Sequence, residues 1–248
     1  MDCKVGADRR VCIDRSKTIA TPMSQEPTPW KDAAKLAFDE ATRLFQDGDY
    51  AGALGLHEWF HDHALEFNPG YYGVRLSFAL SQWKELADVY PPAMTALVRI
   101  RDRDCQRLLS GAGAPELIHD VASIDRCLGQ DDATLELFRK VEAAHPELAK
   151  ESFRFIDRLV LRRDAALFCR YCGDPVGFYS EERELFLRLA ASLRECGRGD
   201  PERLLPMREE LRQVASRLAE VYLDDSEVAA RIARLESSTD EELTRRAS

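Results

Sequence analysis

The sequence predicts an all-α protein, and three observations support this prediction. Ala, Leu, Glu and Arg, which favour helices, dominate the 248 residues, and apolar residues recur at intervals of three and four. Runs rich in Val, Ile and Thr with strand-like alternation are nearly absent. Glycine and proline divide the chain into segments of helical length joined by short turns. We therefore expect antiparallel helical hairpins that stack side by side as a short α-solenoid.

The first expected hairpin begins at Thr28, whose hydroxyl can cap a helix. Pro29 suits the first turn, and Asp32 places negative charge where the helix dipole favours it. Gly48 ends this helix, and the second helix follows over 51–67. The apolar stripe of the first helix comprises Ala34, Ala37, Phe38, Ala41, Leu44 and Phe45.

The remaining segments continue the helical pattern to the end of the chain. Ser180 is a candidate cap, and the acidic residues after it suit a first helical turn. The terminal residues 239–248 are expected to fray. The expected helices or helix pairs cover 74–90, 93–111, 114–149 as a pair, 150–175 as a pair, 180–196, 204–223 and 225–238.

Linkers divide the chain into four predicted regions. Residues 1–27 are polar and unpatterned, and Met23 opens an ordinary start, so this part is predicted to be a disordered tail or an overextended gene start. Residues 28–111 and 112–196 form two helical repeat regions, which "GAGAPE" separates. Residues 197–248 supply the C-terminal helices.

The segment "GQDDATLELFRKVEAAHP" has the spacing of a helical repeat unit. Gly129, Phe138 and Pro146 match the turn and second helix of a tetratricopeptide repeat, and Thr134 and Val141 replace two small alanines. The first hairpin, with "GDYAGAL" at its turn, resembles the same repeat. The resemblance implies an α-solenoid that binds proteins.

The first hairpin departs from the repeat at its second helix. Ala41 and Ala53 occupy the small positions, but Pro69 comes four residues late, which adds about one helical turn. The stretch 57–97 is also similar to a stretch of repeat-like proteins from bacteria, and this similarity implies no activity.

Charge and cysteine content exclude several classes of function. A net charge of −9 argues against a general binder of nucleic acid or of anionic membranes, and the sign-alternating stretch 99–107 is predicted to be a solvated helix face. No apolar run is long enough to cross a membrane. Seven scattered cysteines fit a reducing cytoplasm.

The string "HEWFH" raises the question of a zinc site. In zinc hydrolases of the H-E-x-x-H type, two histidines at this spacing bind the metal and the glutamate polarises the bound water, roles that would fall to His57, His61 and Glu58. His63 lies about 200° around the helix from His61 and cannot complete that site. We therefore predict a packing role for the histidines. The predicted packing stripe comprises Leu56, Trp59, Phe60, His63 and Phe67, with His57 at its edge.

Cys169 and Cys172 form a C-x-x-C pair without a second pair, which a structural zinc site needs. A thioredoxin-type pair needs a strand before it, and none is expected here. We predict that both cysteines are buried between helices.

The prediction for function is a protein-binding module or scaffold that holds a peptide or a helix of a partner. It needs no cofactor and binds neither nucleic acid nor membrane, and it acts as a monomer or weak homodimer in a bacterial cytoplasm. The alternative is a zinc-dependent hydrolase that uses "HEWFH". The predicted partner-binding residues are Lys35, Asp39, Arg43 and Arg75 on the groove, with Tyr71, Tyr72 and Trp83 as an aromatic anchor. The competing interpretation of the three aromatic residues is packing between repeats.

Two further surfaces have competing interpretations. The segment "RLVLRR", with Arg158, Arg162 and Arg163, is predicted to be a solvated face, although it could hold an acidic tail. The helix over 201–223 could make a structural dimer through its apolar stripe. That stripe comprises Leu204, Leu211, Val214, Leu218 and Val221.

Overall fold

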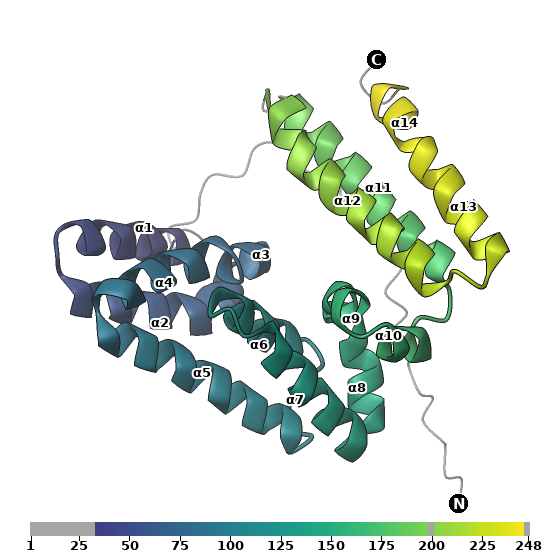
Figure 1. Ribbon diagram of the computed structural model, residues 1–248. Helices are drawn as coiled ribbons and strands as arrows, with labels where there is room; N and C mark the ends of the chain where they lie inside the picture. Colours follow the sequence, from purple (N-terminus) through teal and green to yellow (C-terminus); the bar gives the residue numbers. More distant parts are fainter. Residues whose placement is uncertain (1–32, 198–200, 246–248) are drawn as a thin grey trace, which may run out of the picture.

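The computed structural model describes residues 33–197 and 201–245, and every regular element in these ranges is helical, which confirms the all-α prediction (Figure 1). The predicted tail and the helix start at Thr28 lie outside the described residues. The first seven helices are α1 (Ala33–Gln46), α2 (Tyr50–Phe67), α3 (Tyr71–Arg75), α4 (Phe78–Val89), α5 (Pro91–Leu109), α6 (Leu117–Cys127) and α7 (Asp131–Ala144). They are followed by α8 (Pro146–Ser152), the 3-10 turn η1 (Phe153–Phe155), α9 (Asp157–Arg163), α10 (Ala165–Tyr171), α11 (Pro175–Glu195), α12 (Pro201–Val221), α13 (Ser226–Ser237) and α14 (Thr239–Arg245).

The turns of the two repeat-like hairpins follow from local sequence. Gly48 after α1 and Gly129 after α6 have φ of +83° and +70°, a left-handed conformation that glycine adopts without steric cost. Asp49 then caps α2, since its carboxylate accepts a hydrogen bond from the backbone N–H of Gly52 at 2.9 Å. The sequence predicted both glycine breaks.

The single helix predicted over 74–90 is wrong, because the chain breaks between α3 and α4. Ser77 has φ −129° and ψ −88°, which is not helical, and its hydroxyl donates to the carbonyl of Gly73 at 2.6 Å. A serine side chain that bonds its own backbone competes with the helix at such a position. The break sets α3 apart as a short helix of its own.

The predicted start of α11 at Ser180 is also wrong. Asp174 caps this helix through the backbone N–H of Gly177 at 2.9 Å, and Pro175 takes the first helical position. Ser180 therefore lies inside the helix. At the other end of the chain, Thr239–Arg245 forms α14, where fraying was predicted.

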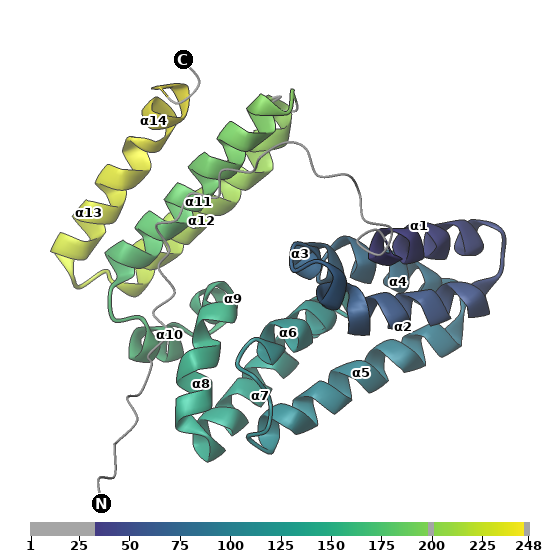
Figure 2. The same ribbon diagram turned by 180° about the vertical axis from the view of Figure 1, so that it is seen from behind.

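The helices form two arms that meet at α8–α10. Helices α1–α9 make one arm and α11–α14 the other, and both views show them diverging from the α9 and α10 region (Figures 1 and 2). The arms are joined where α9 packs on α12. The inner side of the bend is bordered by α6 and α9 on one arm and by α11 and α12 on the other.

Three apolar clusters form the core. The largest runs from Leu108 to Ile232 and joins α5–α13, a second lies among α2 and α4–α6, and a third lies among α1–α4. The apolar stripe of α12 belongs to the largest cluster, because Leu211 and Leu218 are 4% and 0% exposed. The stripe proposed for a dimer is therefore already covered within the chain. None of the described helices has the length and apolar character needed to cross a membrane.

Candidate functional site

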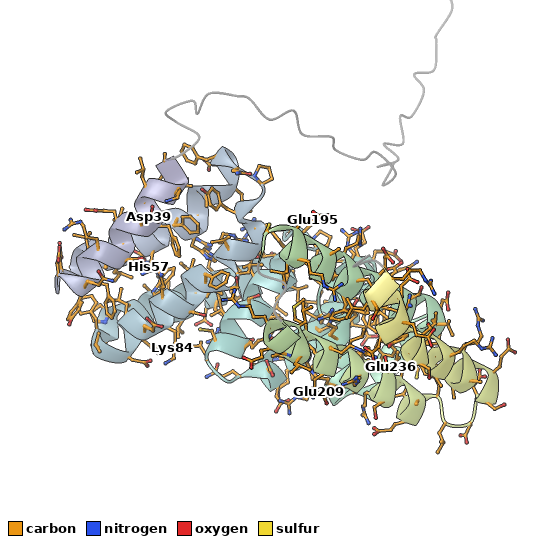
Figure 3. All side chains as sticks on the ribbon, turned by 90° about the horizontal axis from the view of Figure 1, so that it is seen from above. Asp39, His57, Lys84, Glu195, Glu209 and Glu236 are labelled. Atoms are coloured by element: carbon orange, nitrogen blue, oxygen red, sulfur yellow. The ribbon has the colours of Figure 1, made fainter. Side chains whose placement is uncertain are left out.

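The predicted residues on α1 are exposed, and Figure 3 marks one of them, Asp39. Lys35 and Asp39 form an exposed i,i+4 ion pair, with 61% and 54% of their side chains exposed. Arg43 bridges Glu40 and Asp47 along the same helix. These side chains are accessible, but their charges are paired with one another.

The predicted aromatic anchor is divided between packing and hydrogen bonding. Tyr71 packs edge-on against Phe60, with ring centroids 5.6 Å apart. The hydroxyl of Tyr72 lies 2.9 Å from Nδ1 of His119. The prediction that Trp83 contacts a partner is wrong, because its side chain is 1% exposed and its indole N–H donates to the carbonyl of Ala93 at 3.0 Å.

The histidines of "HEWFH" lie at the centre of the buried face of α2. His57, labelled in Figure 3, is 3% exposed and His61 is 5% exposed. The two rings pack on Trp83 with centroids 5.8 and 6.1 Å away. Glu58 instead pairs with Arg99 of α5. The predicted packing role is confirmed, but the predicted stripe is rotated. The buried residues of α2 are Ala53, His57, Phe60, His61 and Ala64.

His63 lies outside this buried face, with 44% of its side chain exposed, so its place in the predicted packing stripe is wrong. Its separation from His57 and His61 around the helix is as predicted. Its Nδ1 lies 3.1 Å from a carboxylate oxygen of Glu66 on the outside of α2. Burial lowers the pKa of His57 to about 4. Burial, together with the positive charges of Arg75 and Arg103, lowers the pKa of His61 to about 3. Both buried imidazoles are therefore neutral at neutral pH.

A buried polar cluster surrounds His61, and Arg75 lies within it. Arg75 is 6% exposed, so the prediction that it faces a binding groove is wrong. Its Nη2 donates to both carboxylate oxygens of Asp120, at 2.7 and 2.8 Å, and its Nη1 lies 3.3 Å from Nε2 of His61. Asp104, 1% exposed, accepts a hydrogen bond from Nε of Arg103 at 3.0 Å. Helices α2, α3, α5 and α6 thus meet at one charged network.

Three members of this buried polar cluster could together hold a metal ion. One ligand atom each from His61, Asp104 and Asp120 lies within 4.8 Å of the others. Nδ1 of His61 has no hydrogen-bond partner among the described residues. Arg75, however, already places a guanidinium against Asp120 and His61, where it supplies the positive charge that the carboxylate needs.

Sequence reasoning missed both aspartates of the cluster. The stretch 99–107 was predicted to be a solvated helix face, which is wrong at Asp104. Leu97, Ile100, Asp104 and Leu108 form one buried stripe of α5, and the spacing of Asp104 on this stripe was visible in the sequence. Asp120 pairs with a residue 45 positions away, and no local pattern shows such a pair.

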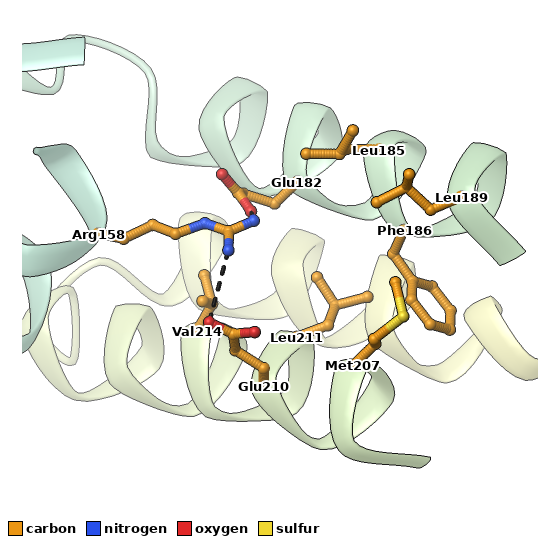
Figure 4. Close-up of a pocket in the computed structure, with 9 residues that line it drawn as sticks. All are labelled: Arg158, Glu182, Leu185, Phe186, Leu189, Met207, Glu210, Leu211 and Val214. Carbon is orange, nitrogen blue, oxygen red and sulfur yellow. Dashed lines mark hydrogen bonds and ion pairs between the residues drawn. The ribbon is translucent and has the colours of Figure 1, made fainter. Parts of the chain in front are cut away.

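A groove lies on the inner side of the bend, between α6, η1 and α9 on one arm and α11 and α12 on the other. The part that α6 and α9 line, called the main part below, has a volume of about 530 Å³. A second cavity of about 140 Å³ continues it between α11 and α12 (Figure 4). Both parts are bordered by Arg158, Glu182, Leu185 and Glu210.

Arg158 joins the two walls of the groove. It forms ion pairs with Glu182 of α11 and, at 3.5 Å, with Glu210 of α12, so that its guanidinium lies between the two helices (Figure 4). Beyond it, Leu185 and Leu189 are 41% and 44% exposed at the mouth of the smaller cavity. Exposed leucines beside a cavity are a common feature of protein-binding surfaces.

Arginines without ion pairs face the main part of the groove. Arg126 on α6 and Arg162 on α9 are exposed, and neither forms a salt bridge with another described residue. In the same wall, burial raises the pKa of Asp157 to about 6, so this carboxyl is still mostly ionised at neutral pH. The prediction that "RLVLRR" is a solvated face is wrong at Arg158, whose guanidinium is held between Glu182 and Glu210. Arg162 and Arg163 are exposed as predicted, and Arg163 pairs with Asp131 outside the groove at 3.5 Å.

The two cysteines of "CRYC" lie at the end of α10. Cys169 is exposed and Cys172 is half-buried, so the predicted burial is wrong for Cys169. Both are free thiols, and burial raises the pKa of Cys172 to about 11.

The fold and its groove define an all-α protein with a concave inner surface. Comparison of the chain with known protein families, with curated proteins and with solved structures found no match.

Proposed function

We propose that this chain is a protein-binding module that holds a segment of a partner protein in the groove between the two arms. The observation that carries the proposal is the main groove of about 530 Å³, continued by a cavity with exposed leucines at its mouth. That volume falls within the range of about 300–1,000 Å³ for ligand sites. Charged side chains line most of the groove, which suits a polypeptide better than a small apolar molecule.

We also propose that the repeat-like hairpins belong to a short TPR-like solenoid. The positions that match the repeat support this proposal. Gly129 forms the turn between α6 and α7, and Phe138, Thr134 and Val141 are fully buried. In a solenoid each hairpin buries its apolar face against its neighbour, which leaves a concave surface for a partner.

Peptide display on the purified full-length chain tests the binding proposal. We expect selected peptides to lose affinity for the variant Leu185→Asp/Leu189→Asp, which places two charges at the mouth of the groove. Leu223→Asp is the matched control, because Leu223 is 77% exposed outside the groove. Leu36→Asp tests the outer face of α1, where the sequence placed Lys35, Asp39 and Arg43. If only Leu36→Asp removes binding, the proposal that peptides bind in the groove is refuted.

The zinc-dependent hydrolase is the second candidate. Its supporting observation is the ligand set of His61, Asp104 and Asp120, one imidazole and two carboxylates. This set retains His61 of "HEWFH" and leaves out His57. Metal analysis of the protein purified without a His tag separates the candidates. One zinc per chain, reduced to background in His61→Ala, would favour the hydrolase, and a sub-stoichiometric content would exclude it.

A further inference from the structure

The groove has a distinct charge character within an acidic chain. Four arginines and three acidic residues, Asp157, Glu182 and Glu210, line its main part, in a protein whose net charge is −9. Arg158 is neutralised by Glu182 and Glu210. Arg154 lies over the ring of Phe155 at 4.6 Å and reaches Glu116 at 3.5 Å. These two arginines are therefore already engaged.

Arg126 and Arg162 are the uncompensated charges of this wall. They lie on α6 and α9, both are exposed, and no ion pair within the described ranges engages either of them. An exposed guanidinium is a fork of donors that binds a carboxylate through two hydrogen bonds. Two such groups in one groove favour a partner that brings carboxylates to this wall.

The smaller cavity is apolar beyond its border of Arg158, Glu182 and Glu210. Its walls are Phe186, Leu211 and Val214 together with Met207, and Leu185 and Leu189 frame its opening. A dry apolar cavity of about 150 Å³ holds a molecule of the size of benzene. The cavity here, about 140 Å³, therefore has room for one aliphatic or aromatic side chain.

Both parts of the groove share the border formed by Arg158, Glu182 and Leu185, so one segment can reach both. We infer that the partner of the groove is an acidic segment with an apolar anchor: its anchor side chain enters the cavity between α11 and α12, and its carboxylates pair with Arg126 and Arg162. This inference rests on the proposed function and specifies the chemistry of its ligand.

A random peptide library displayed against the full-length chain tests the inference. Selected peptides are expected to carry Asp or Glu within a few positions of a Leu, Ile, Met or Phe. Affinity is then measured for one such synthetic peptide on the variant Arg126→Glu/Arg162→Glu. We expect a loss of at least about tenfold, because two attractive charge pairs become repulsive.

The control variant carries the same charge change outside the groove. Arg231→Glu/Arg234→Glu alters two exposed arginines of α13 and is expected to bind the peptide as the wild type does. A peptide with its acidic residues changed to lysine should bind Arg126→Glu/Arg162→Glu better than the wild type. Far-UV circular dichroism checks that each variant is folded.

The outcomes separate the inference from the proposed function. If Leu185→Asp/Leu189→Asp abolishes binding but Arg126→Glu/Arg162→Glu does not weaken it, the groove binds peptides and the acidic class is refuted. If no peptide binds in a groove-dependent way, both proposals fail. If the chain forms a dimer and Leu185→Asp/Leu189→Asp abolishes it, the groove binds a second copy of the chain and the inference is overturned.

Discussion

Replacing Asp120 by Asn tests whether the buried ion pair with Arg75 holds the first arm together. The pair is almost fully buried, with 6% and 10% of the two side chains exposed, and it has two short hydrogen bonds. Asp120→Asn keeps the size of the side chain and removes its charge, so the guanidinium of Arg75 is left buried without a counterion. Breaking such a pair destabilises a protein by about 3–5 kcal/mol.

The expected loss is large enough to measure by thermal unfolding. For a chain of this size, 1 kcal/mol changes Tm by about 2–4 °C, so Asp120→Asn should lower Tm by roughly 6–20 °C. The matched control is Asp88→Asn, which breaks the exposed i,i+4 pair of Asp88 with Lys84. That change is expected to cost no more than about 0.5 kcal/mol. Circular dichroism at a helix wavelength follows both transitions.

A double variant separates the cost of burying the two charges from the stabilisation that their ion pair provides. Burial raises the pKa of Asp120 even beside Arg75, so desolvation outweighs the attraction of the pair. Arg75→Met/Asp120→Leu removes both charges and should therefore be more stable than Asp120→Asn. The reasoning is refuted if Asp120→Asn and Asp88→Asn unfold at the same temperature.

Three further expectations follow from buried or exposed single side chains. The pKa of His57 is lower in the folded chain (about 4) than in the unfolded chain (about 6.5), so the unfolded state takes up the proton first. As the pH is lowered from 6.5 to 4, the free energy of unfolding should decrease by about 3 kcal/mol more in the wild type than in His57→Phe, and urea unfolding at each pH measures it. An equal dependence on pH in the two proteins would contradict this expectation. Trp83→Phe removes part of a buried ring and the indole N–H that bonds the carbonyl of Ala93, so urea unfolding should report a loss of roughly 2–4 kcal/mol; a loss below about 1 kcal/mol would contradict it. Iodoacetamide at pH 8 should modify the exposed Cys169 well before Cys172, because burial raises the pKa of the Cys172 thiol. Peptide mass mapping measures the order of modification, and the reverse order would contradict this expectation.

Local chemistry made most helix positions predictable. Gly48 and Gly129 ended helices where the sequence placed them, because the left-handed conformation they adopt is accessible to glycine at little cost. The start of α11 at Pro175 was missed in favour of Ser180, although it was readable, since Asp followed by Pro is a cap and a first helical residue. The break at Ser77 was not, because neither the serine nor its neighbours in sequence mark a helix end.

The site was harder to predict than the fold, for a physical reason. Periodicity shows which face of a helix is buried, but it does not show which helix covers that face. Asp104 could have been found on the buried stripe of α5, whereas its neighbours Arg75 and Asp120 come from elements far apart in the chain. The groove was equally hard to predict, because its lining residues, such as Arg126 and Leu185, come from different arms.

Helix α6 connects the buried polar cluster with the groove. Its consecutive residues His119 and Asp120 point to different places, because adjacent positions on a helix are about 100° apart. His119 lines the groove, where its ring stacks on Phe155 with centroids 6.1 Å apart, while Asp120 binds Arg75. Tyr72, one turn before Arg75 on α3, links the two by its hydrogen bond to His119. Loss of the buried ion pair should therefore alter the wall of the groove as well as stability, so that Asp120→Asn weakens peptide binding even below its unfolding temperature.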